Sequence, residues 1–186
     1  MQTALSEFLN DKYIICSCEG TAEEAIIDLL LDNSVLCFSR DTLVDNQITR
    51  LRKADKIAEE FLNREYQKDI AILRIIDRDK DKFKLPRIYT EHHRIEIFDV
   101  VTKPEIEILH IIDEDLLTNF IKARTHDKNL KPSEFCKSHF GKNVKNKDFI
   151  EYFYASDIEK LINAIKNYAK NDYSSKYSLN DLLSKA

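Results

Sequence analysis

Acidic side chains follow three apolar runs of this 186-residue chain, each at a point where a buried strand would end. They are Glu19 after residues 13–16, Asp77 and Asp79 after residues 69–76, and Glu105 and Glu107 after residues 94–101. Carboxylate oxygens gathered at one place suit a hard cation such as Mg²⁺ or Mn²⁺, and Mg²⁺ commonly also meets phosphate oxygens. These residue types predict metal-assisted cleavage or transfer of a phosphodiester.

The acidic groups can converge only if the strands are parallel, because the carboxyl ends of parallel strands share one edge of a sheet. Short apolar runs alternate along the chain with stretches whose apolar residues recur at helical spacing. Strands are predicted at residues 13–16, 34–39, 69–76 and 94–101, and helices from Thr21, over 41–67, after Pro86, and over 102–112 with Pro104 in the first turn. This order predicts an α/β fold with a mainly parallel sheet flanked by helices.

The first acid stands in a tight strand-to-helix connection. Gly20 would let the backbone turn directly after Glu19, and Thr21 can cap the helix that follows. Glu23 and Glu24 suit the positive end of that helix. A solvated loop glutamate is the competing interpretation of Glu19.

The second group has a spacing with a physical consequence. Asp77 and Asp79 are two residues apart, so at a strand end their carboxylates point to the same side and can approach one ion. A solvated, charged turn is the alternative explanation of the same residues.

The pattern becomes wholly helical from about residue 120. We therefore expect an α/β core over residues 1–119 and a helical C-terminal region over 120–186, which could belong to the same domain. Residues 120–149, called the basic stretch below, hold many lysines among phenylalanines. Such a pattern can bind a nucleic-acid backbone and stack on bases, or it can simply form an exposed connector.

The composition is that of a soluble globular chain. Hydrophobic residues make up 43% and charged residues 33% of the sequence, and no apolar run approaches the length of a membrane span. We expect a cytoplasmic protein. Its formal charge of −4 does not favour binding of nucleic acid over the whole surface, although a local basic field could still bind it. The four cysteines lack the spacing of a zinc site and are expected to be buried thiols.

The motifs together resemble a known family. The stretch "CSCEGTAEE" around Glu19 resembles the Glu-Gly turn of TOPRIM domains, and "IIDRDKD" resembles their Asp-x-Asp strand end, in the same order along the chain. Adding Glu24 and the segment Pro104-Glu105-Ile106-Glu107 makes the pattern similar to RloB-like and abortive-infection TOPRIM proteins. The resemblance covers roughly residues 12–113.

This resemblance implies a metal-dependent nuclease that cleaves tRNA or DNA. The implied catalytic residues are Glu19, Asp77, Asp79 and Glu107, with Glu105 as the other choice for the third acid. The implied ligands of Mg²⁺ or Mn²⁺ are Glu19, Asp77, Asp79 and Glu24, with Glu23 as the other choice for Glu24. Possible substrate contacts are Arg40, Arg78 and Lys103, and plain salt bridges are at least as compatible with the two arginines.

The resemblance also implies a biological role. Proteins of this kind are often effectors of bacterial anti-phage defence that a separate ATPase controls. The sequence has no Walker motif, so such an ATPase would be another chain. A homodimer is a further expectation.

Two other classes of protein fit parts of the pattern. One is a non-catalytic TOPRIM-like module that binds a partner protein or nucleic acid. The other is a receiver-like or flavodoxin-like regulator, which also has acids at strand ends. A receiver requires an acidic pair near the first strand and a lysine after a late one, whereas this chain offers one glutamate followed by Gly20, and Lys103.

Overall fold

A computed structural model describes residues 5–77, 82–92, 94–154, 156–170 and 176–184. Within this part of the chain the sheet has three strands, β1 (Tyr13–Cys18), β2 (Ile70–Ile76) and β3 (Ile95–Val101). All neighbouring strands are parallel, in the order β1-β2-β3. The α/β fold with a parallel sheet and the predicted strands at 13–16, 69–76 and 94–101 are confirmed.

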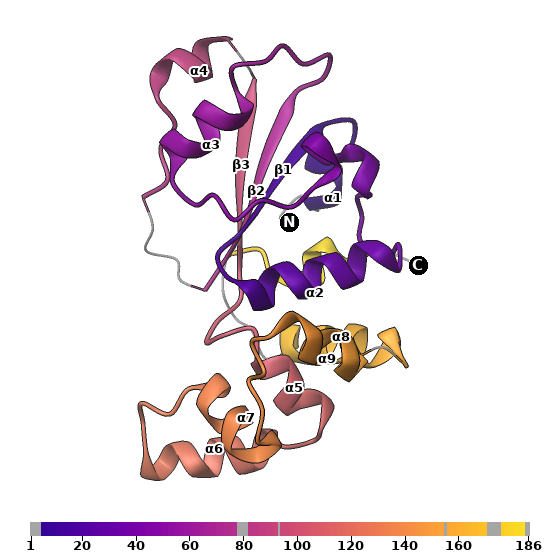
Figure 1. Ribbon diagram of the computed structural model, residues 1–186, viewed down its shortest axis with the longest axis vertical. Coiled ribbons are helices and arrows are strands. Elements are labelled where there is room, and N and C mark those ends of the chain that lie inside the picture. Colours follow the sequence, from indigo (N-terminus) through magenta and orange to yellow (C-terminus); the bar gives the residue numbers. More distant parts are fainter. Residues whose placement is uncertain (1–4, 78–81, 93, 155, 171–175, 185–186) are drawn as a thin grey trace.

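Helices cover both faces of this sheet and form a layer beyond it. Figure 1 shows α3 and α4 on one side of the sheet and α2 on the other, with α5–α9 beyond α2. The helices are α1 (Leu5–Leu9), α2 (Thr21–Asp32), α3 (Ala54–Phe61), α4 (Arg87–His92), α5 (Ile108–Asp113), α6 (Leu117–His126), α7 (Pro132–Phe140), α8 (Lys147–Tyr154) and α9 (Ile158–Ala169). No helix in the described residues is long and apolar enough to cross a membrane.

The alternation of side chains along the strands creates two separate cores. Ile14 and Cys16 of β1 lie in the larger core, on the α2 side, whereas Ile15 lies in the smaller core with Ile57 of α3. The same alternation continues in β2, because successive side chains of a strand point to opposite faces. Both faces of the sheet are therefore apolar over most of their length, as in other buried parallel sheets.

The predicted strand at residues 34–39 is wrong. Leu36 and Phe38 are buried, but among the described residues the segment makes a single antiparallel bridge, between Leu36 and Leu183. Its apolar character reflects packing in the larger core rather than a place in the sheet. An apolar run this short does not distinguish the two situations.

The predicted helix at residues 41–67 is also wrong over its first half. This half contains two 3₁₀ turns, η1 (Arg40–Thr42) and η2 (Val44–Asn46), and α3 begins only at Ala54. Asp45 and Asn46 have φ of 56° and 55°, which a right-handed helix cannot include.

Part of that segment runs beside β1 instead. The Thr49 amide donates to the Cys16 carbonyl at 2.8 Å, and the Cys18 amide donates to the Thr49 carbonyl at 2.9 Å. The segment thus covers the free edge of β1, which would otherwise expose unpaired backbone groups.

The predicted start of the helix after β3 is too early. Pro104 lies four residues before α5, which begins at Ile108. The region 120–186 that was predicted as helical does contain α7, α8, α9 and the 3₁₀ turn η3 (Leu179–Leu182).

The C-terminal segment returns to the N-terminal half of the chain. The Cys37 amide donates to the Leu182 carbonyl at 2.8 Å, and the Ser184 amide donates to the Val35 carbonyl at 2.8 Å. Leu182 is fully buried in the larger core, beside α1. Residues from both predicted units, 1–119 and 120–186, therefore share one core.

Replacement of Leu182 with alanine tests this closure. Leu182→Ala is expected to lower the free energy of unfolding by about 2–5 kcal/mol, because it leaves a cavity in the shared core. Urea unfolding followed by circular dichroism measures the change. Ile88→Ala, at a side chain that is 61% exposed, is the control and should change it by less than about 0.5 kcal/mol. Equal effects of the two substitutions would contradict a structural role for the C-terminal segment.

Candidate active site at the carboxyl edge of the sheet

Two clefts meet at Glu19, where β1 ends. The first, the acidic cleft, has a volume of about 470 Å³ and is lined by Glu19, Gly20, Thr21, Ala22, Glu23, Asp77, Glu105, Glu107, Asn143, Lys145 and Asn146. The second, the basic cleft, has a volume of about 460 Å³ and is lined by Ser17, Glu19, Arg52, Lys53, Ala54, Asp55, Arg74, Ile76, Lys82 and Phe83. Both volumes are in the range typical of ligand sites.

Backbone pairing brings Glu19 and Asp77 together. The Glu19 amide donates to the Ile75 carbonyl at 3.0 Å, which extends the β1–β2 pairing past the end of β1. The Asp77 amide in turn donates to Oε2 of Glu19 at 3.0 Å. On the other side, Oε1 of Glu19 lies 3.6 Å from Nη1 of Arg52. Glu19 therefore stands between an acidic partner and a basic one.

Gly20 lies beside the carboxylate of Glu23. Its backbone is extended, with φ of −139° and ψ of 178°, so any residue could adopt this conformation. A Cβ atom at position 20, however, would lie 2.7 Å from Oε2 of Glu23. The glycine leaves room for the Glu23 carboxylate to face the cleft from the first turn of α2.

Glu105 and Glu107 approach the acidic cleft from the loop that precedes α5. Nζ of Lys145 lies 3.6 Å from Oε1 of Glu105 and 3.8 Å from Oε1 of Glu107. Glu105 also accepts a hydrogen bond from the Ser133 amide at 3.1 Å. Both of the acids that sequence analysis left as alternatives thus line the cleft, and Lys145 pairs with both.

Burial sets the protonation of this group of acids. It raises the pKa of Glu107, whose side chain is 2% exposed, to about 7. Burial also raises the pKa of Glu23, and the charges of Glu19 and Asp77 act in the same direction. Burial also favours a higher pKa for Glu105, but the Ser133 hydrogen bond and the Lys145 charge outweigh it and hold that pKa below the ordinary value.

A divalent cation fits the acidic cleft in donor chemistry and in charge. All five acids offer the hard oxygen ligands that Mg²⁺ takes in proteins, and Lys145 is the one basic side chain among the described residues of its lining. Burial is the main cause of the raised pKa of Glu23, and a bound cation would offset the charges of Glu19 and Asp77 that add to it. Yet in the described part of the chain no group of three or more His, Cys, Asp or Glu side chains converges closely enough to hold a metal ion.

The remaining predicted site residues have different positions. Glu24 does not line the acidic cleft, because neighbouring residues of a helix point about 100° apart and Glu23 faces the cleft. The Oε2 atom of Glu24 lies 3.8 Å from Nε of Arg50. Asp79 and Arg78 lie outside the described residues. Lys103 is exposed on the loop after β3 and lines neither cleft.

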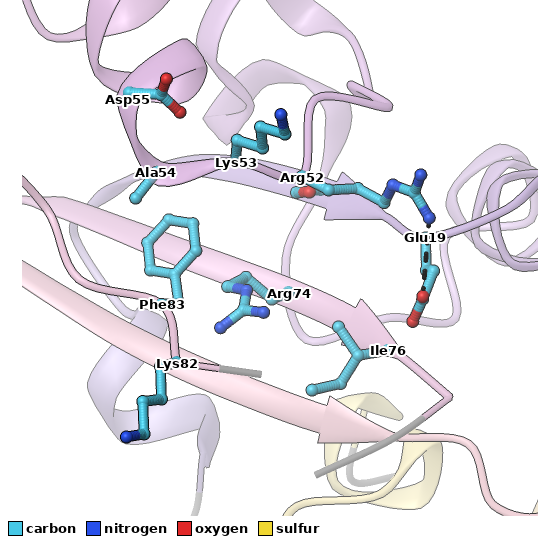
Figure 2. A pocket seen from close by; sticks show the side chains of 10 residues that line it. Glu19, Arg52, Lys53, Ala54, Asp55, Arg74, Ile76, Lys82 and Phe83 are labelled. Carbon is cyan, nitrogen blue, oxygen red and sulfur yellow. Dashed lines mark ion pairs between the residues drawn. The ribbon is translucent and has the colours of Figure 1, made fainter. Parts of the chain in front are cut away.

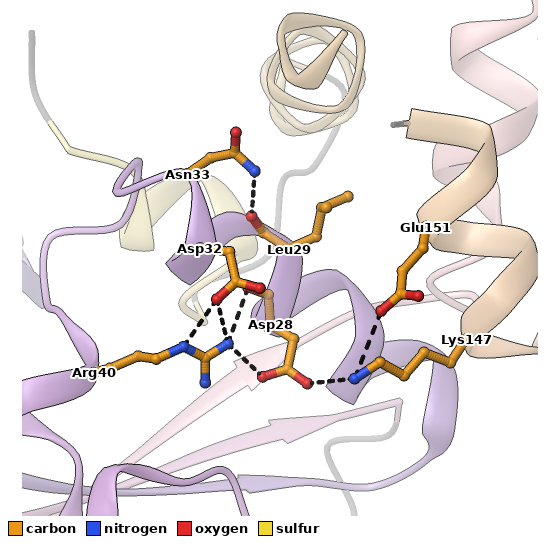
Figure 3. Close-up of polar contacts among 7 residues, drawn as sticks. All are labelled: Asp28, Leu29, Asp32, Asn33, Arg40, Lys147 and Glu151. Atoms are coloured by element: carbon orange, nitrogen blue, oxygen red, sulfur yellow. Dashed lines mark hydrogen bonds and ion pairs between the residues drawn. The ribbon is translucent and has the colours of Figure 1, made fainter. Parts of the chain in front are cut away.

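Arg40 belongs to an ion network away from both clefts. Its Nη2 donates to Asp32 at 2.6 Å and to Asp28 at 2.9 Å, and Nζ of Lys147 lies 3.1 Å from the other Asp28 oxygen (Figure 3). Lys147 also pairs with Glu151 of its own helix. The pair of Lys147 with Asp28 joins α8 to α2. Arg40 is placed to hold these elements together rather than to contact a substrate at the acidic cleft.

The basic cleft was not predicted from the sequence. Figure 2 shows Arg52 and Lys53 on one side of it and Arg74 and Phe83 below them. Arg74 was the detectable signal, since it is the one charged residue within the apolar run of β2. Lys145, in contrast, stands among many lysines of the basic stretch, and no spacing singles it out.

Comparisons of the chain with protein-family models, with curated proteins and with solved structures found no match.

The raised pKa of Glu107 predicts a specific pH dependence of stability. Glutamate titrates near pH 4.5 in the unfolded chain and at about 7 in the folded protein. Between these values the folded protein keeps a proton that the unfolded chain has released, so stability falls as pH rises from about 4.5 to about 7. Glu107→Gln removes this loss. As the pH rises from about 5 to about 8, its free energy of unfolding should therefore increase by about 1–3 kcal/mol relative to that of the wild type.

Urea unfolding at the two pH values, in the presence of EDTA, measures this difference. Glu65→Gln, at an exposed glutamate, is the matched control and should follow the wild type. A Glu107→Gln protein whose stability changes with pH as the wild type does would show that Glu107 is ionised in the folded protein throughout this range.

Proposed function

We propose that this protein is a TOPRIM-like, divalent-metal-dependent nuclease that cleaves phosphodiester bonds of tRNA or DNA in the cytoplasm. One observation supports the proposal: at the carboxyl edge of a parallel sheet the Asp77 amide donates to the Glu19 carboxylate, and both residues line a cleft with three further acids. This is the edge at which open α/β sheets bind ligands. The order of the Glu-Gly and Asp-x-Asp motifs supports the same assignment.

Glu19, Asp77 and Asp79 are the residues that would hold Mg²⁺ or Mn²⁺, with Glu23 in the place first given to Glu24. When bound, the ion would activate a water molecule and offset the charge that develops on phosphoryl oxygens. The Asp77 amide holds the Glu19 carboxylate in position through its hydrogen bond to Oε2. These contacts fix the two acids before substrate arrives.

Glu107 and Lys145 are suited to different tasks. A carboxyl with a pKa of about 7 can both hold and release a proton near neutral pH, which suits Glu107 to exchange a proton with the leaving oxygen. Lys145, whose side chain is half exposed, can offer its ammonium group to a non-bridging phosphate oxygen. Glu105 and Glu107 hold that ammonium group at the cleft.

The family resemblance extends this proposal to a biological role. The nuclease would act as the effector of a bacterial anti-phage defence system, under the control of a separate ATPase, and could work as a homodimer. The charge of −4 is compatible with a substrate that is bound locally rather than over the whole surface.

One observation favours a second candidate, a TOPRIM-like module that binds nucleic acid or a partner without cleaving it. The described acids include no converging set of three that could hold a metal ion. In this case the acidic cleft would recognise a basic group, as Glu105 and Glu107 already do with Lys145.

Cleavage assays separate the two candidates. Purified protein is incubated with total tRNA, single-stranded DNA and plasmid, in Mg²⁺, Mn²⁺ or EDTA. We expect metal-dependent cleavage that falls at least about 100-fold in Glu19→Ala and in the double variant Asp77→Ala/Asp79→Ala, because the charge stabilisation at the phosphate is lost.

The matched control for the double variant is Glu60→Ala/Glu65→Ala, two exposed acids outside both clefts. It should cleave like the wild type. The catalytic proposal is wrong if the wild type and both site variants are equally inactive, including when proteins encoded beside this chain are added. The binding module then takes its place.

Metal binding can be tested without any substrate. Mg²⁺ at a hundred times its Kd should stabilise the folded protein by about 2.7 kcal/mol, because the ion binds the folded state alone. Thermal unfolding over a Mg²⁺ series measures this effect. We expect it in the wild type and in Glu60→Ala, and its loss in Glu19→Ala. Equal stabilisation of all three proteins would place the ion elsewhere.

A further inference from the structure

We infer that the basic cleft binds a backbone phosphate of a nucleic-acid strand, next to the phosphate that the acidic cleft holds. The inference deepens the proposed function, since it assigns the path of the strand across Glu19, and it rests on nucleic acid being the ligand. It concerns Arg52, Lys53, Arg74 and Lys82, none of which sequence analysis had assigned.

The floor of the cleft follows from the alternation of side chains in the sheet. On the face that α3 covers, Ile15 and Ile72 are apolar and pack in the smaller core. Two residues further along each strand the same face carries Ser17 and Arg74. The face therefore changes from apolar to polar where the cover of α3 ends, and the cleft lies at this change.

Arg74 is held firmly in this floor. Its side chain is 3% exposed, its Nη1 lies 3.2 Å from Oδ1 of Asp99, its register partner on β3, and its guanidinium lies 4.2 Å from the ring centre of Phe83. Burying a charge in a strand is costly unless it is paired in this way. These contacts fix the guanidinium at the base of the cleft, with Asp99 offsetting part of its charge.

Three further basic side chains, Arg52, Lys53 and Lys82, line the basic cleft around Arg74. Arg52 is 61% exposed, and its contact with Glu19 is long, at 3.6 Å, so its guanidinium can turn to a ligand at small cost. Lys53 follows it at the N-cap of α3, where its side chain makes no capping hydrogen bond, and the helix dipole adds positive potential there. Lys82 lines the cleft from the segment before Phe83.

The contrast between the two clefts identifies the ligand. Four basic and two acidic side chains line the basic cleft, whereas five acids and one lysine line the acidic cleft. The acidic cleft repels a polyanion unless a cation is bound there. The affinity for a polyanion must therefore come from the basic cleft. Glu19 lines both clefts, which sets a bound strand across this residue with adjacent phosphates on either side.

Binding in EDTA tests the inference apart from catalysis. Fluorescence anisotropy is measured with labelled single-stranded DNA and RNA of about 16 nucleotides over a salt series. We expect Arg52→Gln/Lys53→Gln to weaken binding by about tenfold or more for every sequence, because phosphate contacts carry no sequence information. The slope of log K against log salt should fall by roughly 1.4, the value for two lost phosphate contacts with a single strand.

Lys160→Gln/Lys166→Gln is the control with the same change of charge, at exposed lysines of α9 that line neither cleft and lie outside residues 120–149. It should bind within about twofold of wild type. Glu19→Gln should bind at least as tightly as wild type without metal, since it removes a negative charge. Lys82→Gln, a single change on another wall of the cleft, provides a second variant if the double variant fails to fold.

The inference would be overturned by no binding of the wild type, by wild-type affinity of the cleft variants, or by an equal loss in the control. Competition by adenosine monophosphate as strong as that by the strand would also overturn it, because the ligand would then be a free nucleotide. If the cleft variants lose binding but no strand is cleaved under any condition, the nuclease proposal fails and this inference stands.

Discussion

The parallel pairing of β1 with β2 is the constraint on which the candidate site depends. The pairing continues one residue past β1, where the Glu19 amide donates to the Ile75 carbonyl. It therefore delivers Glu19 beside Asp77, although 58 residues separate them in sequence. A shift of one residue in this register would turn Glu19 to the α2 face and remove it from both clefts.

The same strands divide charge between two clefts. Residues beyond the strand ends are acidic and gather with Lys145, whereas the last residues of the α3 face are polar or basic and gather around Arg74. Glu19 belongs to both groups, with Asp77 on one side and Arg52 on the other. This arrangement suits a ligand that needs a cation at one phosphate and basic side chains at the next.

The sequence allowed prediction of what depends on local pattern. The buried strands and the acids after them were predictable, because strand ends in a parallel sheet share one edge. The segment 34–39 was not, since burial in a core and pairing in a sheet leave the same apolar pattern. Lys145 was equally hidden, because its pairing with Glu107 depends on how the layer of α5–α9 folds back. Arg74 was visible as a charge inside an apolar strand, but its meaning needed the position of α3.

We propose that the ends of β1 and β2 together form a cation site. The most direct measurement is a crystal structure of the protein grown with Mn²⁺, in which anomalous scattering locates the ion without reference to activity. We expect one strong peak between the carboxylates of Glu19 and Asp77, in the acidic cleft. A peak at another place only, or an empty acidic cleft at saturating Mn²⁺, would contradict it.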